Sequence, residues 1–232
     1  MKAMILAAGL GTRFGDLTKK IPKPMIELNS IPLIEHSILN LKKSGIKDII
    51  INVFWLGDVI KNYLASRGFS ELNLKIIDEK NQILGTGGGI KNALPYLGRE
   101  PFWLMNSDLF TTFEARPNFK LSKNFLGHLI LVENPPHNHD GEFGLNGGLV
   151  ERKKGVNKLT YSGISCLSPA IFQDIPDDVF PLEPILYKLA GEKKLSGEHF
   201  KDLWVDIGTM DRLALAENLC QKLQKSPGVS KN

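Results

Sequence analysis

The N-terminal segment combines glycines and two cationic side chains at a spacing that suits a polyphosphate. An apolar run over residues 4–8 leads into Gly9-Leu10-Gly11-Thr12-Arg13, and Lys23 follows between two prolines. Glycines let backbone N–H groups approach phosphate oxygens, while the arginine and the lysine can meet the negative charge. No Gly-Lys-Ser/Thr follows as in a P-loop, and Gly15 comes one residue too late for GxGxxG. The segment therefore predicts a phosphate-binding turn of a different type.

Two aspartates are candidates for a metal site. Asp108 follows the apolar residues 101–105, and Asp206 follows Trp204-Val205. If both segments are strands, both carboxylates project from strand ends, where Mg²⁺ is held by one or two carboxylates together with phosphate oxygens and water. Either aspartate alone could instead cap a helix or form a turn.

Four motifs taken together resemble the signature of the sugar-1-phosphate nucleotidyltransferases. They are L-A-A-G-x-G-T-R with P-K-P at residues 6–24, L-G-T-G-G-G at 84–89, N-S-D at 106–108 and W-V-D-I-G-T at 204–209. The resemblance implies a nucleotide-diphospho-sugar transferase fold and an enzyme that joins a nucleoside triphosphate to a sugar 1-phosphate and releases pyrophosphate. Within the family, the pattern most resembles the short members that act on UTP and N-acetylmuramic acid 1-phosphate in peptidoglycan recycling.

The resemblance also implies which residues form the site. Arg13, Lys23 and Asp108 are the expected catalytic residues, and Asp108 and Asp206 are the expected Mg²⁺ ligands. The expected nucleotide contacts are Ala8, Gly9, Gly11, Thr12, Arg13, Lys23, Glu79, Gly88 and Asn106. The expected sugar contacts are Glu142, Gly148, Glu151, Ser162 and Gly163.

Three positions near these motifs need separate mention. Glu79 could equally be a surface carboxylate, and Ser107 replaces the glycine that the family commonly has before the first aspartate. His137-x-His139 has the spacing of a metal pair, but it lies in a polar loop without a third ligand. We therefore interpret both histidines as solvated.

The expected reaction is attack by a sugar-phosphate oxygen on the α-phosphorus of the nucleotide. The nucleophile is already an anion at neutral pH, so it needs no protein base. The difficulty is electrostatic, because two polyanions must meet and the leaving pyrophosphate must be neutralised. Positioning and cations should therefore supply most of the catalysis.

The composition favours a globular enzyme and excludes several other classes. The chain has 232 residues, enough for one substantial α/β core. Its net charge of +4 is too small for a general nucleic-acid binder. No apolar segment approaches transmembrane length, and the two cysteines, Cys166 and Cys220, cannot form a disulfide framework. We expect a cytoplasmic enzyme with small-molecule substrates, UTP and a sugar 1-phosphate, and no nucleic-acid or membrane partner.

Strands and helices are expected to alternate up to residue 108, which predicts an α/β fold with a Rossmann-like, mostly parallel sheet flanked by helices. A small inserted β region, rich in Asn, Pro, Gly and His, is expected to form the sugar side. Residues 1–224 should form a single domain, with a nucleotide half at about 1–110, a sugar half at about 111–224 and a flexible tail at 225–232. The expected strands are 2–7, 48–53, 74–77, 101–105, 126–133, 144–151, 158–161, 162–167 and 197–201, and the expected helices are 32–43, 58–66, 88–94, 180–189 and 210–223.

Other functions remain open from the sequence. The sugar could be glucose, mannose or N-acetylglucosamine 1-phosphate, or the substrate could be phosphocholine with CTP. A non-catalytic nucleotide-sugar sensor could keep the fold, but such a sensor could lose the aspartate pair that this chain retains. A dinucleotide-dependent oxidoreductase would need GxGxxG and an acidic residue after the second strand, where this chain has Asn52. The oligomeric state and any regulation are not indicated.

Overall fold

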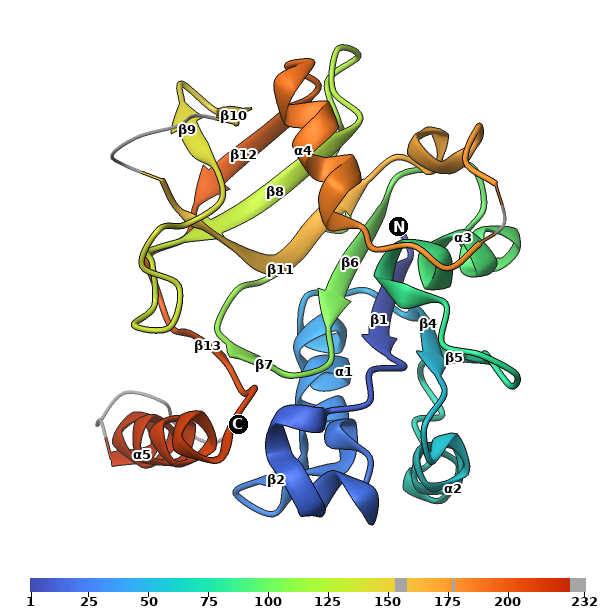
Figure 1. Cartoon of the computed structure of the whole chain (residues 1–232). Coiled ribbons are helices and arrows are strands. Elements are labelled where there is room, and N and C mark those ends of the chain that lie inside the picture. The colour runs from blue at the N-terminus through green and yellow to red at the C-terminus, as the bar shows by residue number, and fades with distance from the viewer. Residues whose placement is uncertain (153–157, 177, 226–232) are drawn as a thin grey trace.

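The computed structural model describes residues 1–152, 158–176 and 178–225. Residues 226–232 of the expected tail lie outside them. Within the described residues, the main sheet has nine strands in the order β5-β4-β1-β6-β11-β8-β12-β10-β9 (Figure 1). In chain order they are Ala3–Ala7 (β1), Asp48–Val53 (β4), Asn73–Asp78 (β5), Phe102–Asn106 (β6), Gly127–Val132 (β8), Gly144–Asn146 (β9), Leu149–Glu151 (β10), Thr160–Leu167 (β11) and Leu195–His199 (β12).

One half of the sheet is parallel and gathers polar residues at one edge. β1 pairs in parallel with β4 and with β6, and β5 pairs in parallel with β4. The register sets Leu6 of β1 opposite Asn52 on one side and opposite Asn106 on the other. Because parallel strands end at the same edge, the segments that follow β1 and β6 meet there.

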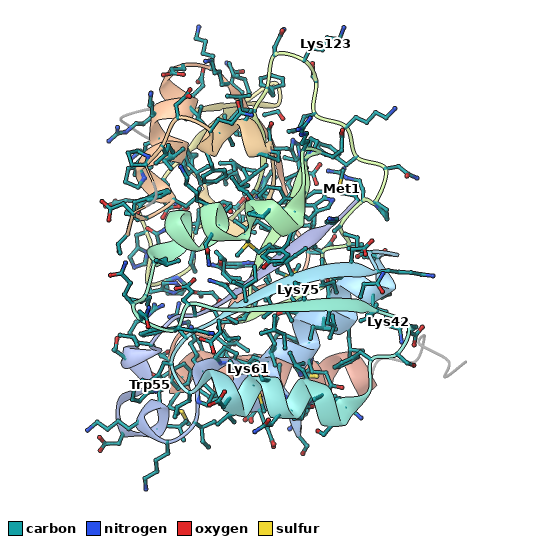
Figure 2. The ribbon with its side chains drawn as sticks, turned by 90° about the vertical axis from the view of Figure 1, so that its right-hand side faces the viewer. Met1, Lys42, Trp55, Lys61, Lys75 and Lys123 are labelled. Carbon is teal, nitrogen blue, oxygen red and sulfur yellow. The ribbon has the colours of Figure 1, made fainter. Side chains whose placement is uncertain are left out.

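Five α-helices among the described residues cover both faces of this sheet and the region beside it. They are Leu33–Lys43 (α1), Gly57–Arg67 (α2), Gly85–Leu97 (α3), Glu183–Gly191 (α4) and Met210–Lys225 (α5). Alternate residues of β1 enter different cores: Ile5 packs with residues of α1 and α2, and Met4 packs with residues of α3 and α4. Figure 2 looks onto the β5 edge, which carries Lys75, with α2 and Lys61 on one side and α3 on the other.

The other half of the sheet changes direction. β11 is antiparallel to both β6 and β8, β12 is parallel to β8, and the β9–β10 hairpin adds to β12 in antiparallel fashion. The expected inserted β region is therefore not a separate layer: its hairpin forms the edge of the main sheet (Figure 1). The predicted α/β fold class, with helices flanking a Rossmann-like sheet, is confirmed.

Several short elements complete the chain around the sheet. They are the 3-10 turns Thr12–Lys19 (η1), Lys23–Met25 (η2) and Pro169–Phe172 (η3), the paired strands Glu27–Leu28 (β2) and Ile31–Pro32 (β3), and the paired strands Leu109–Thr111 (β7) and Trp204–Asp206 (β13). Phe14 of η1, Leu28 of β2, Val205 of β13 and Leu213 of α5 share a third core. In the part of the chain that the structure describes, no helix combines the length and hydropathy needed to cross a membrane.

The expected secondary structure is found with three corrections, apart from shifts at the ends of elements. The expected strand 144–151 is the hairpin of β9 and β10. Residues 158–161 and 162–167 do not form two strands, because Thr160–Leu167 is one strand with a bulge between Tyr161 and Ser165. Phe180 is not helical: α4 begins only at Glu183, because the segment before it packs against the glycine-rich start of α3 instead. The turn η1 and the strand pair β7–β13 were not predicted, because elements this short leave little periodicity in a sequence.

Candidate active site

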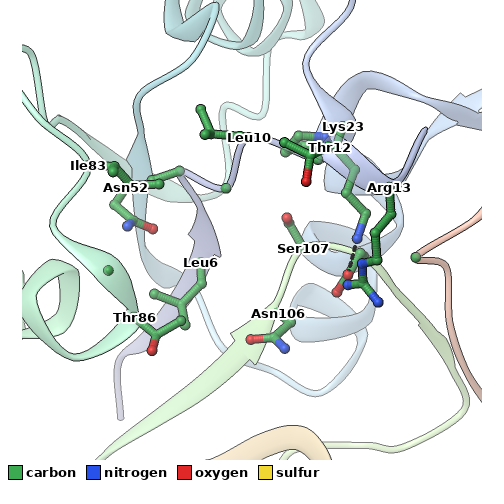
Figure 3. A pocket seen from close by; sticks show the side chains of 17 residues that line it. Leu6, Leu10, Thr12, Arg13, Lys23, Asn52, Ile83, Thr86, Asn106 and Ser107 are labelled. Atoms are coloured by element: carbon green, nitrogen blue, oxygen red, sulfur yellow. Dashed lines mark hydrogen bonds and ion pairs between the residues drawn. The ribbon is translucent and has the colours of Figure 1, made fainter. Parts of the chain in front are cut away.

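A cavity of about 450 Å³ lies where β1 and β6 end. Figure 3 shows Arg13 and Lys23 on one side of it, Asn52 and Thr86 on the other, and Asn106 between them. The lining is formed by Leu6, Ala8, Gly9, Leu10, Gly11, Thr12, Arg13, Lys23, Pro24, Asn52, Ile83, Gly85, Thr86, Asn106, Ser107, Asp108 and Gly208. The structure thus brings together seven of the nine expected nucleotide contacts, the exceptions being Glu79 and Gly88.

The glycine turn after β1 places Lys23 as well as its own backbone. Gly11 adopts a φ of 66°, and a Cβ there would lie 2.7 Å from Cβ of Lys23. Only glycine therefore permits both this turn and the close approach of the lysine. The Thr18 hydroxyl donates to the carbonyl oxygens of Gly11 at 3.1 Å and of Gly15 at 3.2 Å, which fixes the turn against η1. Gly9 is different, because a Cβ there would meet nothing within 4 Å.

Lys23 and Asp108 form an ion pair inside the cavity. Lys23 Nζ donates to Asp108 Oδ2, and the two side chains are only 12% and 17% exposed. Lys23 begins the 3-10 turn η2 and is followed by buried Pro24, so the backbone that carries it is stiff. Two cationic side chains, Arg13 and Lys23, therefore line the same cavity from the same segment of the chain.

The two aspartates are brought together by the strand pair β7–β13. Asp206 pairs with Leu109, and the N–H of Ile207 donates to the carbonyl oxygen of Asp108 at 2.7 Å. Both carboxylates line a further cavity of about 340 Å³, which adjoins the first because Arg13, Asn106 and Asp108 line both. Burial raises the pKa of Asp206, the positive charges of Arg212 and His137 oppose that rise, and the negative charge of Asp108 adds to it. The two carboxylates thus place hard oxygen donors side by side at the edge of one cavity.

Arg212 and His137 reach Asp206 from opposite parts of the chain. Arg212 Nη1 donates to both carboxylate oxygens of Asp206 at 2.6 Å, and it lies 2.6 Å from His137 Nε2. His137 Nε2 is also 3.4 Å from Asp206 Oδ1. His137 is an exposed loop residue, as interpreted, with its side chain 40% exposed, but its imidazole also contacts Arg212 and Asp206, which the sequence did not indicate. Thr209, whose carbonyl and hydroxyl oxygens accept from the N–H groups of Leu213 and Arg212, caps the helix that presents the arginine.

Asn106 is held at the end of β6 by a bulge in β11. Gly163 has a φ of 79°, and a Cβ there would lie 2.5 Å from Asn106 Nδ2. Trp204 Nε1 donates to the carbonyl oxygen of Ser162 at 2.9 Å, which ties the bulge to β13. The hydroxyl of Ser162 accepts from the N–H of Ile164, and Ser162 is almost fully buried. Gly163 therefore acts by making room for Asn106.

Asn106 also lies between the first cavity and the region expected to bind the sugar. A cavity of about 290 Å³ shares Asn106 with it and is bounded by Glu142 and by apolar side chains. The Glu142 carboxylate accepts from Asn138 Nδ2 at 2.5 Å and from the N–H of Tyr161 at 2.8 Å, so its orientation is fixed. The full lining is Leu6, Thr86, Leu104, Asn106, Glu142, Phe143, Tyr161, Pro181, Leu182, Glu183 and Leu186.

Two of the expected sugar contacts are elsewhere. Gly148 lies in the turn of the β9–β10 hairpin at the sheet edge, and Glu151 is the last residue of β10. Neither residue lines any of the three cavities described above. Gly148 adopts a φ of 84° in the hairpin turn. Glu142, Ser162 and Gly163, in contrast, all line the cavity that contains Asp206.

The glycine-rich start of α3 is packed under residues 178–182, which we call the strap. A Cβ on Gly85 would lie 2.7 Å from the carbonyl oxygen of Phe180, and one on Gly87 would lie 2.4 Å from the Phe180 ring. The N–H groups of Gly87 and Gly88 donate to that same carbonyl oxygen at 2.9 and 3.1 Å. A Cβ on Gly88 would lie 2.5 Å from the carbonyl oxygen of Asp178. These glycines therefore admit the strap, and Gly88, an expected nucleotide contact, does not line the cavity.

Glu79 supports the same loop from below the cavity lining. It is 7% exposed, so it is not a surface carboxylate. Its carboxylate accepts from Asn52 Nδ2 at 2.7 Å and from the N–H of Leu84 at 2.8 Å. Asn52 in turn accepts from the N–H of Ala7 at 3.1 Å, so the end of β1, β4 and the start of α3 are linked. Gly85 and Thr86, which do line the cavity, are positioned by this network.

Gly87→Ala is expected to lower the free energy of unfolding by about 1–3 kcal/mol, because the new methyl group must displace the Phe180 ring. Chemical denaturation of the variant measures the loss. In a Phe180→Ala background the same substitution should cost much less, since the obstructing ring is gone. Gly191→Ala is the matched control, because a Cβ there would meet nothing within 4 Å. An equal cost of Gly87→Ala in both backgrounds would contradict the role given to the strap.

Comparison with known proteins agrees with this geometry. The sequence model of the family described as "Nucleotidyl transferase" matches residues 2–145. The N-acetylmuramate alpha-1-phosphate uridylyltransferase of Neisseria meningitidis is 38% identical over 226 residues, which cover 94% of this chain and 98% of that protein. The protein of the same name from Caulobacter vibrioides is 31% identical and covers 93% of this chain and 95% of its own length. The crystal structure of HddC from Yersinia pseudotuberculosis complexed with GMP-PN superposes with a TM-score of 0.78 at 27% identity, covering 94% of this chain and 99% of that one.

Proposed function

Because this chain belongs to the nucleotidyl transferase family, whose members here include sugar-1-phosphate uridylyltransferases, we propose that it transfers UMP from UTP to N-acetylmuramic acid 1-phosphate. The products are the UDP-sugar and pyrophosphate, and the reaction belongs to peptidoglycan recycling. The observation that carries the proposal is the gathering of Arg13, Lys23 and Asp108 with the glycine turn in one cavity. The specific substrates are those in the names of the Neisseria and Caulobacter relatives. Since both substrates are cytoplasmic metabolites in this proposal, the enzyme acts in the cytoplasm.

The phosphate side of the reaction falls to the glycine turn and the two cations. Backbone N–H groups of Gly9 to Thr12 and the Arg13 guanidinium bind triphosphate oxygens, since a guanidinium can hold two oxygens at once. Lys23 neutralises charge at the α-phosphate as the sugar-phosphate oxygen attacks and pyrophosphate leaves. Atoms and charge balance without a protein base, because the attacking phosphate oxygen is already ionised.

The aspartate pair suits Mg²⁺. The carboxylates of Asp108, which directly precedes β7, and of Asp206 in β13 supply the hard oxygen donors that this ion prefers. Among the described residues no group of three His, Cys, Asp or Glu side chains is placed to hold a metal, so phosphate oxygens and water complete the site. When bound, the ion supplies charge neutralisation for the phosphates. Asp108 and Asp206 hold it, and Lys23 and Arg212 are their present counter-ions.

The sugar binds in the two cavities of about 290 and 340 Å³, both of which share Asn106 with the phosphate cavity. Asn106 binds a hydroxyl of the ribose or the sugar, and the anchored Glu142 accepts from a neutral donor of the sugar, such as the acetamido N–H. Leu104, Phe143 and Leu182 form an apolar wall nearby that suits a methyl group. We further propose that residues 1–224 act as one domain, because the sheet runs without interruption from the nucleotide half to the sugar half.

The test is pyrophosphate release with UTP, GTP, CTP and dTTP, each against the 1-phosphates of N-acetylmuramic acid, N-acetylglucosamine, glucose and mannose, and against phosphocholine. UTP with N-acetylmuramic acid 1-phosphate should give the highest kcat/KM by at least about tenfold, or ~1.4 kcal/mol. A higher kcat/KM for a pair that contains GTP, whose guanine base is represented in the HddC complex, would overturn the uridylyl assignment and leave the family assignment intact. No release with any pair would favour a nucleotide-sugar sensor.

A further inference from the structure

Each aspartate of the candidate metal site already has a cationic partner. Asp108 is paired with Lys23, which the sequence motifs pointed to, and Asp206 is paired with Arg212, which they did not. The Arg212 side chain is 13% exposed, so the second pair is largely shielded from water. Charge-assisted hydrogen bonds in such a setting are stronger than surface ion pairs.

Arg212 occupies the whole carboxylate of Asp206. A single nitrogen, Nη1, donates to both oxygens at 2.6 Å, and His137 Nε2 lies at the same distance from that nitrogen. A divalent cation bound by these oxygens would lie beside a guanidinium nitrogen of like charge. The arginine and the metal therefore compete for Asp206.

The Arg212 guanidinium already lies beside the phosphate cavity, against Gly208. Gly208 lines the phosphate cavity, and the position of a Cβ there would be 2.1 Å from Arg212 Nη2 and 3.0 Å from Arg13 Nη1. Both guanidiniums thus reach the same point beside a residue without a side chain. Arg13 lines the phosphate cavity and Arg212 lies directly beside it, so the two guanidinium groups can hold an anion between them, and phosphate oxygens meet that requirement.

We propose that Arg212 is an exchangeable counter-ion: it neutralises Asp206 while the site holds no metal, and it passes to the substrate's phosphate oxygens when a divalent cation takes the carboxylate. The inference rests on the proposed role of Asp108 and Asp206 as metal ligands. It assigns to α5 a direct part in coupling metal binding to phosphate binding, because the Arg212 guanidinium that the metal displaces is the group that then binds the phosphate.

The experiment is a titration of the substrate-free protein with MnCl₂, in which electron paramagnetic resonance measures the free ion. Removing the competing charge with Arg212→Met should tighten Mn²⁺ binding by at least about fivefold, the lower end of measured coupling between sites. Arg212→Lys, which keeps a cation, should stay closer to the original protein. Arg99→Met, the loss of an exposed arginine far from the site, should change nothing. A thermal melt of each variant establishes folding, and Arg212→Gln replaces the methionine variant if that one does not fold.

The outcomes separate this inference from the proposed function. If Asp206→Asn binds Mn²⁺ as the original protein does, Asp206 is not a metal ligand and the exchange fails, while the substrate assignment is still decided by pyrophosphate release. If Asp206→Asn loses binding while Arg212→Met binds Mn²⁺ equally or more weakly, the metal site stands and the exchange is overturned, because the arginine then serves only to position the carboxylate. Tighter binding by Arg212→Met, lost again on adding Asp206→Asn, supports the exchange.

Discussion

Asp108→Asn should reduce kcat by about a thousandfold or more, since loss of a metal-binding carboxylate removes several kcal/mol of transition-state stabilisation. Two further interactions are weakened at the same time: the charge that pairs with Lys23 and the negative field that acts on Asp206. Asp206→Asn should have an effect of similar size, because both carboxylates line one cavity. Steady-state pyrophosphate release at saturating Mg²⁺ measures the loss.

The matched control for this result is Asp16→Asn. Asp16 is paired with Lys19 on the surface, where its side chain is 91% exposed, and its loss should leave kcat unchanged. Melting curves should show that Asp108→Asn and Asp206→Asn remain folded, since neither side chain belongs to a hydrophobic core. A folded Asp108→Asn protein with the original rate at saturating Mg²⁺ would remove Asp108 from the mechanism.

Lys23→Ala should lower kcat by about a hundredfold while leaving the KM for UTP nearly unchanged, as expected for a cation that acts where charge develops. Arg13→Ala should lower kcat to a similar extent and should also raise the KM for UTP, because its guanidinium holds phosphate oxygens before and during the reaction. The difference between the two variants is measured by varying UTP at a saturating concentration of the sugar phosphate.

Lys19→Ala provides the comparison for both variants, because this lysine lies in the same segment but is 77% exposed. It should change neither constant. A Lys23→Ala protein that is altered only in its KM for UTP would make Lys23 a binding residue. The contribution of the Lys23–Asp108 pair to folding is read separately from the thermal melt, so that lost activity is not confused with lost structure.

The phosphate side could be predicted from the sequence because its chemistry lies in one short segment. Gly9, Gly11, Arg13 and Lys23 fall within fifteen residues, and the turn geometry that glycine permits is a local property. The parallel strands were equally accessible, since β1 is a continuous apolar run after Lys2 and β4 contains the apolar run of residues 49–51. The roles assigned to these site residues stay predictions until the kinetic tests are made.

The remaining features depend on contacts between distant segments. The glycines of α3 are needed because Phe180, about 90 residues further along the chain, packs against them. The residues around Phe180 had predicted a helix. His137 lies in a polar loop, where a solvated side chain is the ordinary expectation, yet it meets Arg212 across the site. Arg212 follows Asp206 by six residues in the first turns of α5, and that spacing was the one available signal for it. Gly148 and Glu151, in contrast, lie near Glu142 in the sequence but do not line the cavities described above.

The pairing of β7 with β13 has a consequence for the order in which the enzyme is made. All nine strands of the main sheet are contained in residues 1–199, so the sheet has its full set of strands once His199 has emerged from the ribosome. Asp206, and with it Arg212, is synthesised later and docks against Leu109, nearly a hundred residues upstream. Domains fold largely as units during synthesis. A nascent chain therefore passes through a stage in which the main sheet can form with half of the carboxylate pair, and the cavity lining is completed only after Asp206 and Gly208 have emerged.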